Sequence, residues 1–118
     1  MFQETLQHLV DRAGARWAMI VGNDGILLET DKRGFRSEAE AMAAEYAVCL
    51  RAARKAAGNT EMGMLMTASL ATERGKVLLQ SLNGDYFLAL LLEPESYAGK
   101  ACYELGRVTQ SLQQELSI

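Results

Sequence analysis

The residues best placed for chemistry are 22–25, Gly-Asn-Asp-Gly, between two apolar runs. Glycines beside side-chain oxygens can cradle a phosphate, hold a metal ion or reverse the chain. A calcium-binding EF loop needs glycine at its sixth position and oxygen ligands at its first and third. With Gly25 sixth, Ile20 and Gly22 take those ligand positions, which excludes such a loop. A phosphate nest normally leads into a helix, whereas residues 26–31 resemble a strand, so the segment predicts a hairpin turn.

The titratable and nucleophilic residues form no catalytic constellation. His8 is the only histidine, and it lacks the partners that a proton relay or a zinc site requires. Cys49 and Cys102 have no metal or redox spacing and are expected to be buried free thiols, with a reactive or interfacial thiol as the alternative. Glu29 and Asp31 are expected to be solvated at a strand end. The sequence therefore predicts a non-enzymatic protein without cofactor or metal.

Composition limits the class of protein further. The 118 residues, 49% hydrophobic and 23% charged, predict a single domain over 1–118. A net charge of −3 argues against nucleic-acid binding. The N-terminus lacks the pattern of a signal peptide, and the apolar run at 87–92 is too short for membrane insertion. A cytoplasmic location is therefore expected.

Periodic apolar residues predict three helices. The first carries the stripe Phe2, Leu6, Leu9, Val10 and Ala13. The second is expected over 38–57, with a capping box of Ser37 and Glu40 at its start and Gly58 at its end. Ser96 is expected to cap the third helix. Its apolar face comprises Ala98, Ala101, Cys102, Leu105, Val108, Leu112 and Leu116.

Five strand-like runs complete the order α-β-β-α-β-β-β-α. They are residues 16–21, 26–31, 62–72, 76–82 and 85–93. The fourth and fifth runs are apolar at successive positions, so both sheet faces must be covered. The second helix is expected on one face and the two terminal helices on the other. This predicts an α/β/α sandwich around a five-stranded, mainly antiparallel sheet of order 2-1-5-4-3.

The second helix and the third strand run predict an interface with another chain. The helix has one stripe that can cover the sheet, formed by Ala39, Met42, Ala43, Tyr46, Leu50 and Ala53. A second, offset stripe comprises Ala41, Ala44, Val48, Ala52 and Ala56. Small residues on this face allow a helix–helix contact, although alanine is also simply the best helix former.

An unprotected sheet edge is the second indication of a partner. Residues 62–71 carry no charge, whereas edge strands are usually protected by charges, proline or bulges. Met62, Met64 and Met66 are expected to alternate onto one face of this strand, and Ala68 is expected in the same interface. A symmetric homodimer would pair these strands and the second helices.

The hairpin at 19–31, the alanine-rich helix and the closing strand at 84–93 resemble the Roadblock dynein-light-chain superfamily, particularly its small bacterial MglB-like members. The resemblance covers residues 2–116. It implies an α+β, profilin- or longin-like fold and non-enzymatic homo- or heterodimers joined by edge strands and second helices. It also implies binding of small Ras-like GTPases, as activating partners or scaffolds in bacterial signalling, polarity or motility. The chain ends soon after the last helix, which favours binding over activation.

Candidate partner-binding residues are inferred near the second helix. They are Arg33, Arg36, Tyr46 and Arg51. The leading hypothesis is a homodimeric regulator or adaptor of a small Ras-like GTPase. The alternatives are a structural scaffold or light-chain-like module without dependence on nucleotide state, and a small-molecule sensor built on the same sheet.

Overall fold

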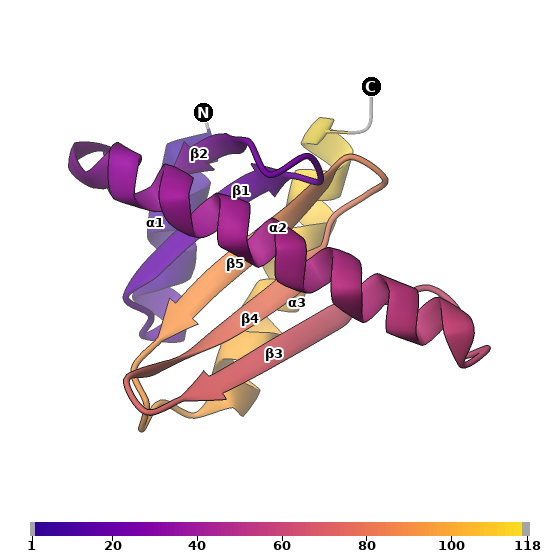
Figure 1. Ribbon diagram of the computed structural model, residues 1–118. Helices are drawn as coiled ribbons and strands as arrows, with labels where there is room; N and C mark the ends of the chain where they lie inside the picture. The colour runs from indigo at the N-terminus through magenta and orange to yellow at the C-terminus, as the bar shows by residue number, and fades with distance from the viewer. Residues whose placement is uncertain (1, 117–118) are drawn as a thin grey trace.

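The computed structural model describes residues 2–116, apart from the side chain of Arg33. Figure 1 shows the order of the elements. They are α1 (Phe2–Ala13), β1 (Trp17–Gly22), β2 (Leu27–Thr30), the 3-10 turn η1 (Arg33–Phe35), α2 (Arg36–Asn59), β3 (Thr67–Thr72), β4 (Gly75–Ser81), β5 (Tyr86–Leu92) and α3 (Ala98–Leu116). The predicted order of helices and strands is confirmed.

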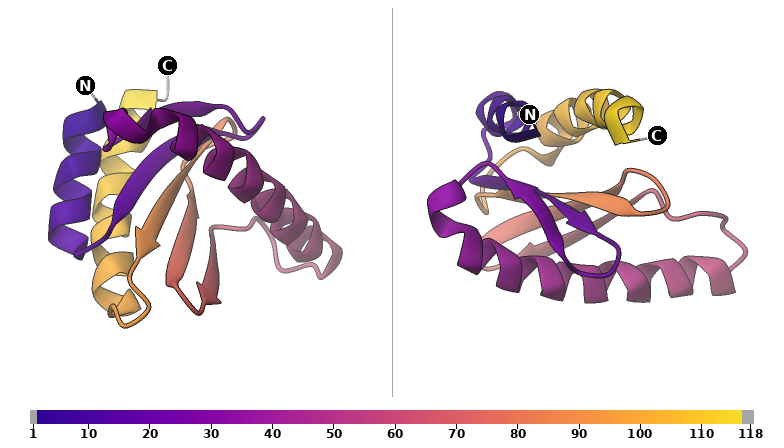
Figure 2. Two further views of the ribbon diagram at one scale, coloured as in Figure 1. Left: turned by 60° about the vertical axis from the view of Figure 1, so that its left-hand side comes forward. Right: turned by 90° about the horizontal axis from the view of Figure 1, so that it is seen from above.

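The five strands form one sheet in the order β2-β1-β5-β4-β3, and every neighbouring pair is antiparallel. Figure 2 shows α2 on one face of the sheet and α1 and α3 on the other. The predicted three-layer sandwich is therefore confirmed, including β2 and β3 as its two edges. No helix among residues 2–116 is long and apolar enough to cross a membrane.

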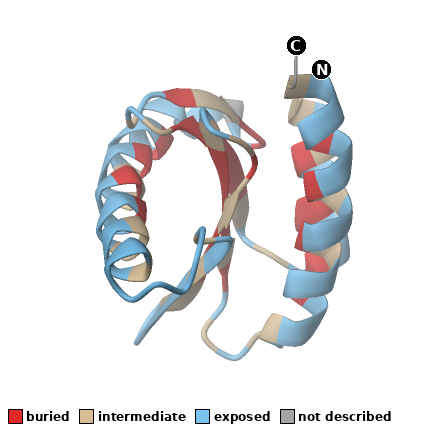
Figure 3. Ribbon diagram, turned by 90° about the vertical axis from the view of Figure 1, so that its right-hand side faces the viewer, coloured by how far each residue is buried: buried red, intermediate tan, exposed pale blue. Residues whose placement is uncertain are grey.

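Two hydrophobic cores hold the layers together. Between the sheet and the terminal helices, buried leucines such as Leu6 and Leu105 meet Ile20 and Leu90. Between the sheet and α2, the buried residues are Met19, Val21, Leu27, Ala39, Ala43, Ala47, Leu50, Val77, Leu79, Phe87 and Ala89. The alternation of side chains along β1 and β5 supplies both cores, which is why these strands are apolar at successive positions. Figure 3 shows the buried residues on the inward sides of the layers.

The ends of α2 differ from the prediction. The helix begins at Arg36, and Phe35 occupies the N-cap position without a side-chain cap, so the predicted capping box is wrong. Gly58 lies inside the helix, which continues to Asn59. The chain reverses afterwards, where Glu61 and Gly63 adopt φ values of +59° and +86°. Residues 62–66 lie outside β3, which begins only at Thr67, so the expected alternation of the methionines on a strand is also wrong.

Three further side chains lie in environments that the sequence did not predict. Cys49 and Cys102 are both exposed free thiols and do not fill a core. Alanine-rich surroundings misled the prediction, because alanine suits both faces of a helix. Asp31 is buried at 7% exposure instead of solvated. Its Oδ1 accepts the backbone N–H of Ala18 at 2.9 Å. Burial raises the pKa of the Asp31 carboxyl, an effect that this hydrogen bond opposes.

Candidate interaction surface

The exposed side of α2 forms the first part of the candidate surface. The residues of α2 that face the core are Ala39, Ala43, Ala47 and Leu50. Sequence reasoning omitted Ala47 from this stripe. The offset stripe of Ala41, Ala44, Val48, Ala52 and Ala56 is exposed throughout, and Val48 has 53% of its surface accessible. We define these five residues as the outer stripe of α2; Figure 3 shows the outer side of this helix as exposed.

Strand β3 forms the second part of the candidate surface. All its residues are exposed except the half-buried Ala68, and Leu70 retains 38% of its surface. The opposite edge is different, since β2 has only four residues and pairs with β1 through an irregular register. The guanidinium of Arg36 also covers β2 by donating to the carbonyl oxygen of Leu27 at 3.3 Å. Short, irregular and covered edges resist pairing with another chain, whereas β3 has none of these protections.

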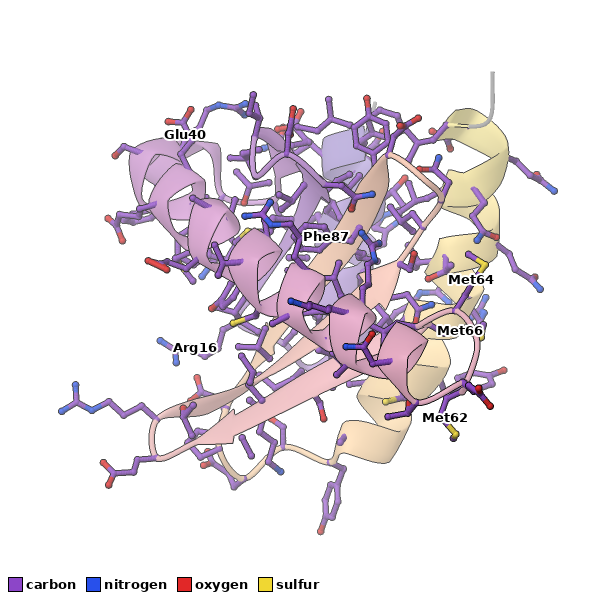
Figure 4. All side chains as sticks on the ribbon, turned by 45° about the vertical axis from the view of Figure 1, so that its right-hand side comes forward. Arg16, Glu40, Met62, Met64, Met66 and Phe87 are labelled. Carbon is purple, nitrogen blue, oxygen red and sulfur yellow. The ribbon has the colours of Figure 1, made fainter. Side chains whose placement is uncertain are left out.

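The methionine segment, residues 62–66, forms the third part of the candidate surface. Met62, Met64 and Met66 have 80%, 91% and 70% of their surfaces exposed, and Figure 4 shows them on the connection between α2 and β3. A surface groove of about 1,020 Å³ lies beside this segment. Its walls come from Met64–Thr67, from the end of β4 and from one side of α3 that includes Gly106 and Gln110.

The four candidate partner-binding residues do not form one patch. Arg36 bonds to β2 and lies 3.7 Å from the Glu29 carboxylate. Arg51 donates to the carbonyl oxygen of Asn23 at 3.2 Å, so these two arginines attach α2 to the β1–β2 hairpin. Tyr46 packs partly against the core beneath α2, and burial raises the pKa of its phenol. The Arg33 side chain lies outside the described residues.

A polar and aromatic cluster beside η1 was missed by sequence reasoning. Trp17 donates its indole N–H to the Thr30 hydroxyl at 2.6 Å. The Trp17 ring meets Phe35 edge-on at 6.2 Å between centroids, and the ammonium of Lys32 lies 5.6 Å from the Trp17 centroid. These contacts fix the chain just before α2. The only signal in the sequence was the lone tryptophan at the start of a strand.

Residues 22–25 form a turn, as predicted. Gly25 adopts φ +91°, which suits glycine, and the Asp24 carboxylate accepts the backbone N–H of Ile26 at 3.0 Å. Asn23 joins this turn to the β4–β5 turn by donating its side-chain amide to the Gly84 carbonyl oxygen at 2.6 Å. Among the described residues, no group of three or more His, Cys, Asp or Glu side chains is arranged to hold a metal ion.

The three layers and the strand order define a profilin-like α+β protein. Comparison with solved structures finds the same architecture in other proteins. The Roadblock/LC7 domain of Streptomyces avermitilis superposes with a TM-score of 0.90 at 18% identity over 98% of each chain. MglB of Myxococcus xanthus gives 0.89 at 11% identity, over 98% of this chain and 94% of that one. Profilin Ib of Acanthamoeba castellanii gives 0.67 at 14% identity over 98% of both chains. At these identities the likeness concerns the fold.

The family follows from the sequence itself. The model of the Roadblock/LC7 domain matches residues 1–92, and the chain belongs to the Roadblock/LC7 family. Comparison with curated proteins finds no match. The resemblance expected from the hairpin, the alanine-rich helix and the closing strand is thus confirmed.

Proposed function

We propose that the chain is a homodimeric, non-enzymatic adaptor or regulator of a small Ras-like GTPase in bacterial signalling, polarity or motility. The observation that carries the proposal is the β3 edge, which is exposed, uncharged and unprotected. A sheet edge of this kind offers unpaired backbone donors and acceptors to a second chain. The proposed second chain is a copy of the same protein.

The surface around β3 supports a symmetric dimer. The outer stripe of α2 and the methionine segment both expose apolar side chains. Neither contains lysine, arginine, aspartate or glutamate. Small side chains let a second helix approach closely, and methionine adapts to irregular contacts. We assign Ala41, Ala44, Val48, Ala52, Met62, Met64, Met66 and Ala68 to this interface.

The GTPase part of the proposal depends on the family. Membership in the Roadblock/LC7 family and the fold shared with M. xanthus MglB favour a regulatory partner over a substrate. We place the GTPase contact along α2, where Arg51 and the neighbouring exposed side chains remain available on a dimer. Arg51 is exposed although its guanidinium also bonds to the β1–β2 turn.

Calorimetric titration against the small Ras-like GTPases of the source organism tests this function. One sample of each GTPase is loaded with GDP and one with a non-hydrolysable GTP analogue. A regulator binds the two samples with different affinities, since only differential binding can couple a partner to nucleotide state. Equal affinity for both samples would favour the scaffold. Absence of binding to either would contradict the GTPase partner.

A further inference from the structure

A pocket of about 360 Å³ lies at the corner of the sheet where β1 begins and β5 ends. Trp17 and Leu91 are opposite one another in the β1–β5 ladder and line this pocket. Together with Met42 of α2 they pack against the core beneath the helix, yet all three are only half-buried. Figure 1 shows that α2 crosses the sheet and does not run over this corner. The pocket therefore has an apolar floor that the chain itself leaves incompletely covered.

Two aromatic rings form one side of the pocket. The indole of Trp17 is held in place by its hydrogen bond to the Thr30 hydroxyl at 2.6 Å. The ring of Phe35 meets it at an interplanar angle of 73°, and Phe35 still has 52% of its surface exposed. Rings in such an arrangement accept a third ring in offset or edge-to-face contact. A ligand ring placed here would cover the exposed part of Phe35.

The charged residues that line the pocket are two cations and one anion, Arg16, Lys32 and Glu38. The Lys32 ammonium lies 5.6 Å from the centroid of Trp17, so the chain already places its own cation beside the ring. A ligand cation would meet two like charges, whereas a ligand anion would find two partners. The three charges leave one positive charge in excess, which a singly charged carboxylate balances and a doubly charged phosphate exceeds.

The guanidinium of Arg16 is held at the pocket by contacts with groups outside it. Its Nε lies 3.3 Å from the Glu93 carboxylate, and its Nη1 donates to the carbonyl oxygen of Arg74 at 3.3 Å. A guanidinium has five N–H donors, and two of them belong to Nη2. Arg16 is therefore positioned before a ligand arrives and carries further donors for a carboxylate.

We propose that this pocket binds a small aromatic anion, a single ring that carries a carboxylate on a short chain. The ring packs against Trp17 and Phe35, and the carboxylate lies between Lys32 and Arg16. The volume falls in the lower part of the range of about 300–1,000 Å³ that is usual for ligand pockets. None of the pocket residues belongs to the surface assigned to the homodimer or to the GTPase contact. The inference therefore goes beyond the proposed function and does not depend on it.

Nuclear magnetic resonance titration of the full chain with phenylpropionate tests the pocket. The indole N–H of Trp17, the only tryptophan, gives a single reporter signal, and the backbone amides of Lys32 and Phe35 give two more. We expect saturable shifts of these signals with a Kd of about 1 mM, which is usual for a ligand of this size. Phenylpropylamine has the same ring with the opposite charge and should bind at least about tenfold more weakly. Hexanoate has the carboxylate without a ring and should bind at least about threefold more weakly.

Two variants locate the ligand within the pocket. Lys32→Met keeps the length of the side chain and removes its charge, and Phe35→Ala removes one aromatic side. Each should weaken phenylpropionate binding at least about threefold. The matched controls are Lys100→Met on exposed α3 and Tyr97→Ala, whose tyrosine is 87% exposed outside the pocket. Both controls should bind like the natural chain.

The possible outcomes separate the parts of this inference. Absence of a saturable shift at Trp17 overturns the pocket, as does binding that Lys32→Met and Phe35→Ala leave unchanged. Equal binding of phenylpropylamine overturns the selectivity for an anion, and equal binding of hexanoate overturns the selectivity for a ring. The mass of the chain in solution tests the homodimer without any of these ligands, so failure of the pocket and failure of the proposed function are distinguishable.

Discussion

The indole Nε1 of Trp17 donates to the hydroxyl oxygen of Thr30 at 2.6 Å. The same hydroxyl donates to the carbonyl oxygen of Ala18 at 3.2 Å, and Thr30 is completely buried. One side chain thus satisfies a tryptophan N–H and a backbone carbonyl across the β1–β2 pair. The contact holds Trp17 against Phe35, immediately before α2 begins.

Replacing Thr30 with valine keeps the shape and removes the hydroxyl. We expect Thr30→Val to lower the free energy of unfolding by about 1–3 kcal/mol, because the indole N–H and the Ala18 carbonyl lose their partner. Urea unfolding measures the loss, and the fluorescence of Trp17, the only tryptophan, reports the local change. Ser111→Ala on exposed α3 is the matched control and should change stability by less than about 0.5 kcal/mol. Equal stability of the two variants would contradict a structural role for the Thr30 hydroxyl.

The buried carboxyl of Asp31 predicts a pH dependence. Burial raises its folded-state pKa above the ordinary value, so the folded chain binds this proton more tightly than the unfolded chain. The contribution of Asp31 to stability therefore falls as the pH rises from the ordinary pKa through the raised one. Asp31→Asn retains an oxygen for the Ala18 N–H and has no charge to bury. We expect its stability relative to the natural chain to increase with pH across this interval.

Urea unfolding of both proteins at several acidic and neutral pH values measures this difference. Asp24→Asn, in the exposed turn, is the control for a general loss of negative charge. A stability difference between Asp31→Asn and the natural chain that stays constant with pH would contradict the raised pKa.

Local patterns in the sequence predicted the fold because they act over a few residues. The apolar stripe of α1 has a short period, and the turn at 22–25 has a fixed turn chemistry. The start of α2 could not be read in this way. It is determined by Arg36 on the Leu27 carbonyl and by Phe35 on Trp17, which are contacts between elements. A Ser-x-x-Glu pattern carries no information about these contacts.

A charge on the β3 edge should separate the proposed dimer. Leu70→Lys places an ammonium on the exposed edge strand β3, and burying this charge in a dimer interface would cost more free energy than strand pairing gains. We expect the dimer to dissociate at least about tenfold more readily, which corresponds to about 1.4 kcal/mol. Light scattering measures the mass, and circular dichroism checks that the fold is kept. Ser111→Lys on α3 is the control. A Leu70→Lys dimer as stable as the control would exclude β3 from the interface.

A charge on the outer stripe tests the helix contact separately. Ala44→Glu adds a carboxylate on the exposed side of α2, where the helix itself tolerates it. We expect weaker dimerisation in a dilution series, with Ser111→Glu on exposed α3 unchanged. If Ala44→Glu dimerises like the natural chain while Leu70→Lys does not, the edge strand alone forms the interface.

The candidate surface was only partly predictable. The exposure of Val48 was predictable from the helical spacing of the apolar residues in α2. The exposure of the β3 edge was predictable from the expected strand order of the sheet. The tethering of Arg36 and Arg51 to the hairpin was not predictable, because it depends on where α2 crosses the sheet. The methionines are exposed as an interface requires, but they lie in a connection and not on a strand, because Gly63 interrupts the extended run.

The mass of the natural chain in solution tests the central claim most directly. Multi-angle light scattering over a range of micromolar concentrations distinguishes one copy from two without a variant or a partner. The proposed homodimer predicts a mass of twice the 12.9 kDa of the chain. A mass of 12.9 kDa across the whole range would contradict it.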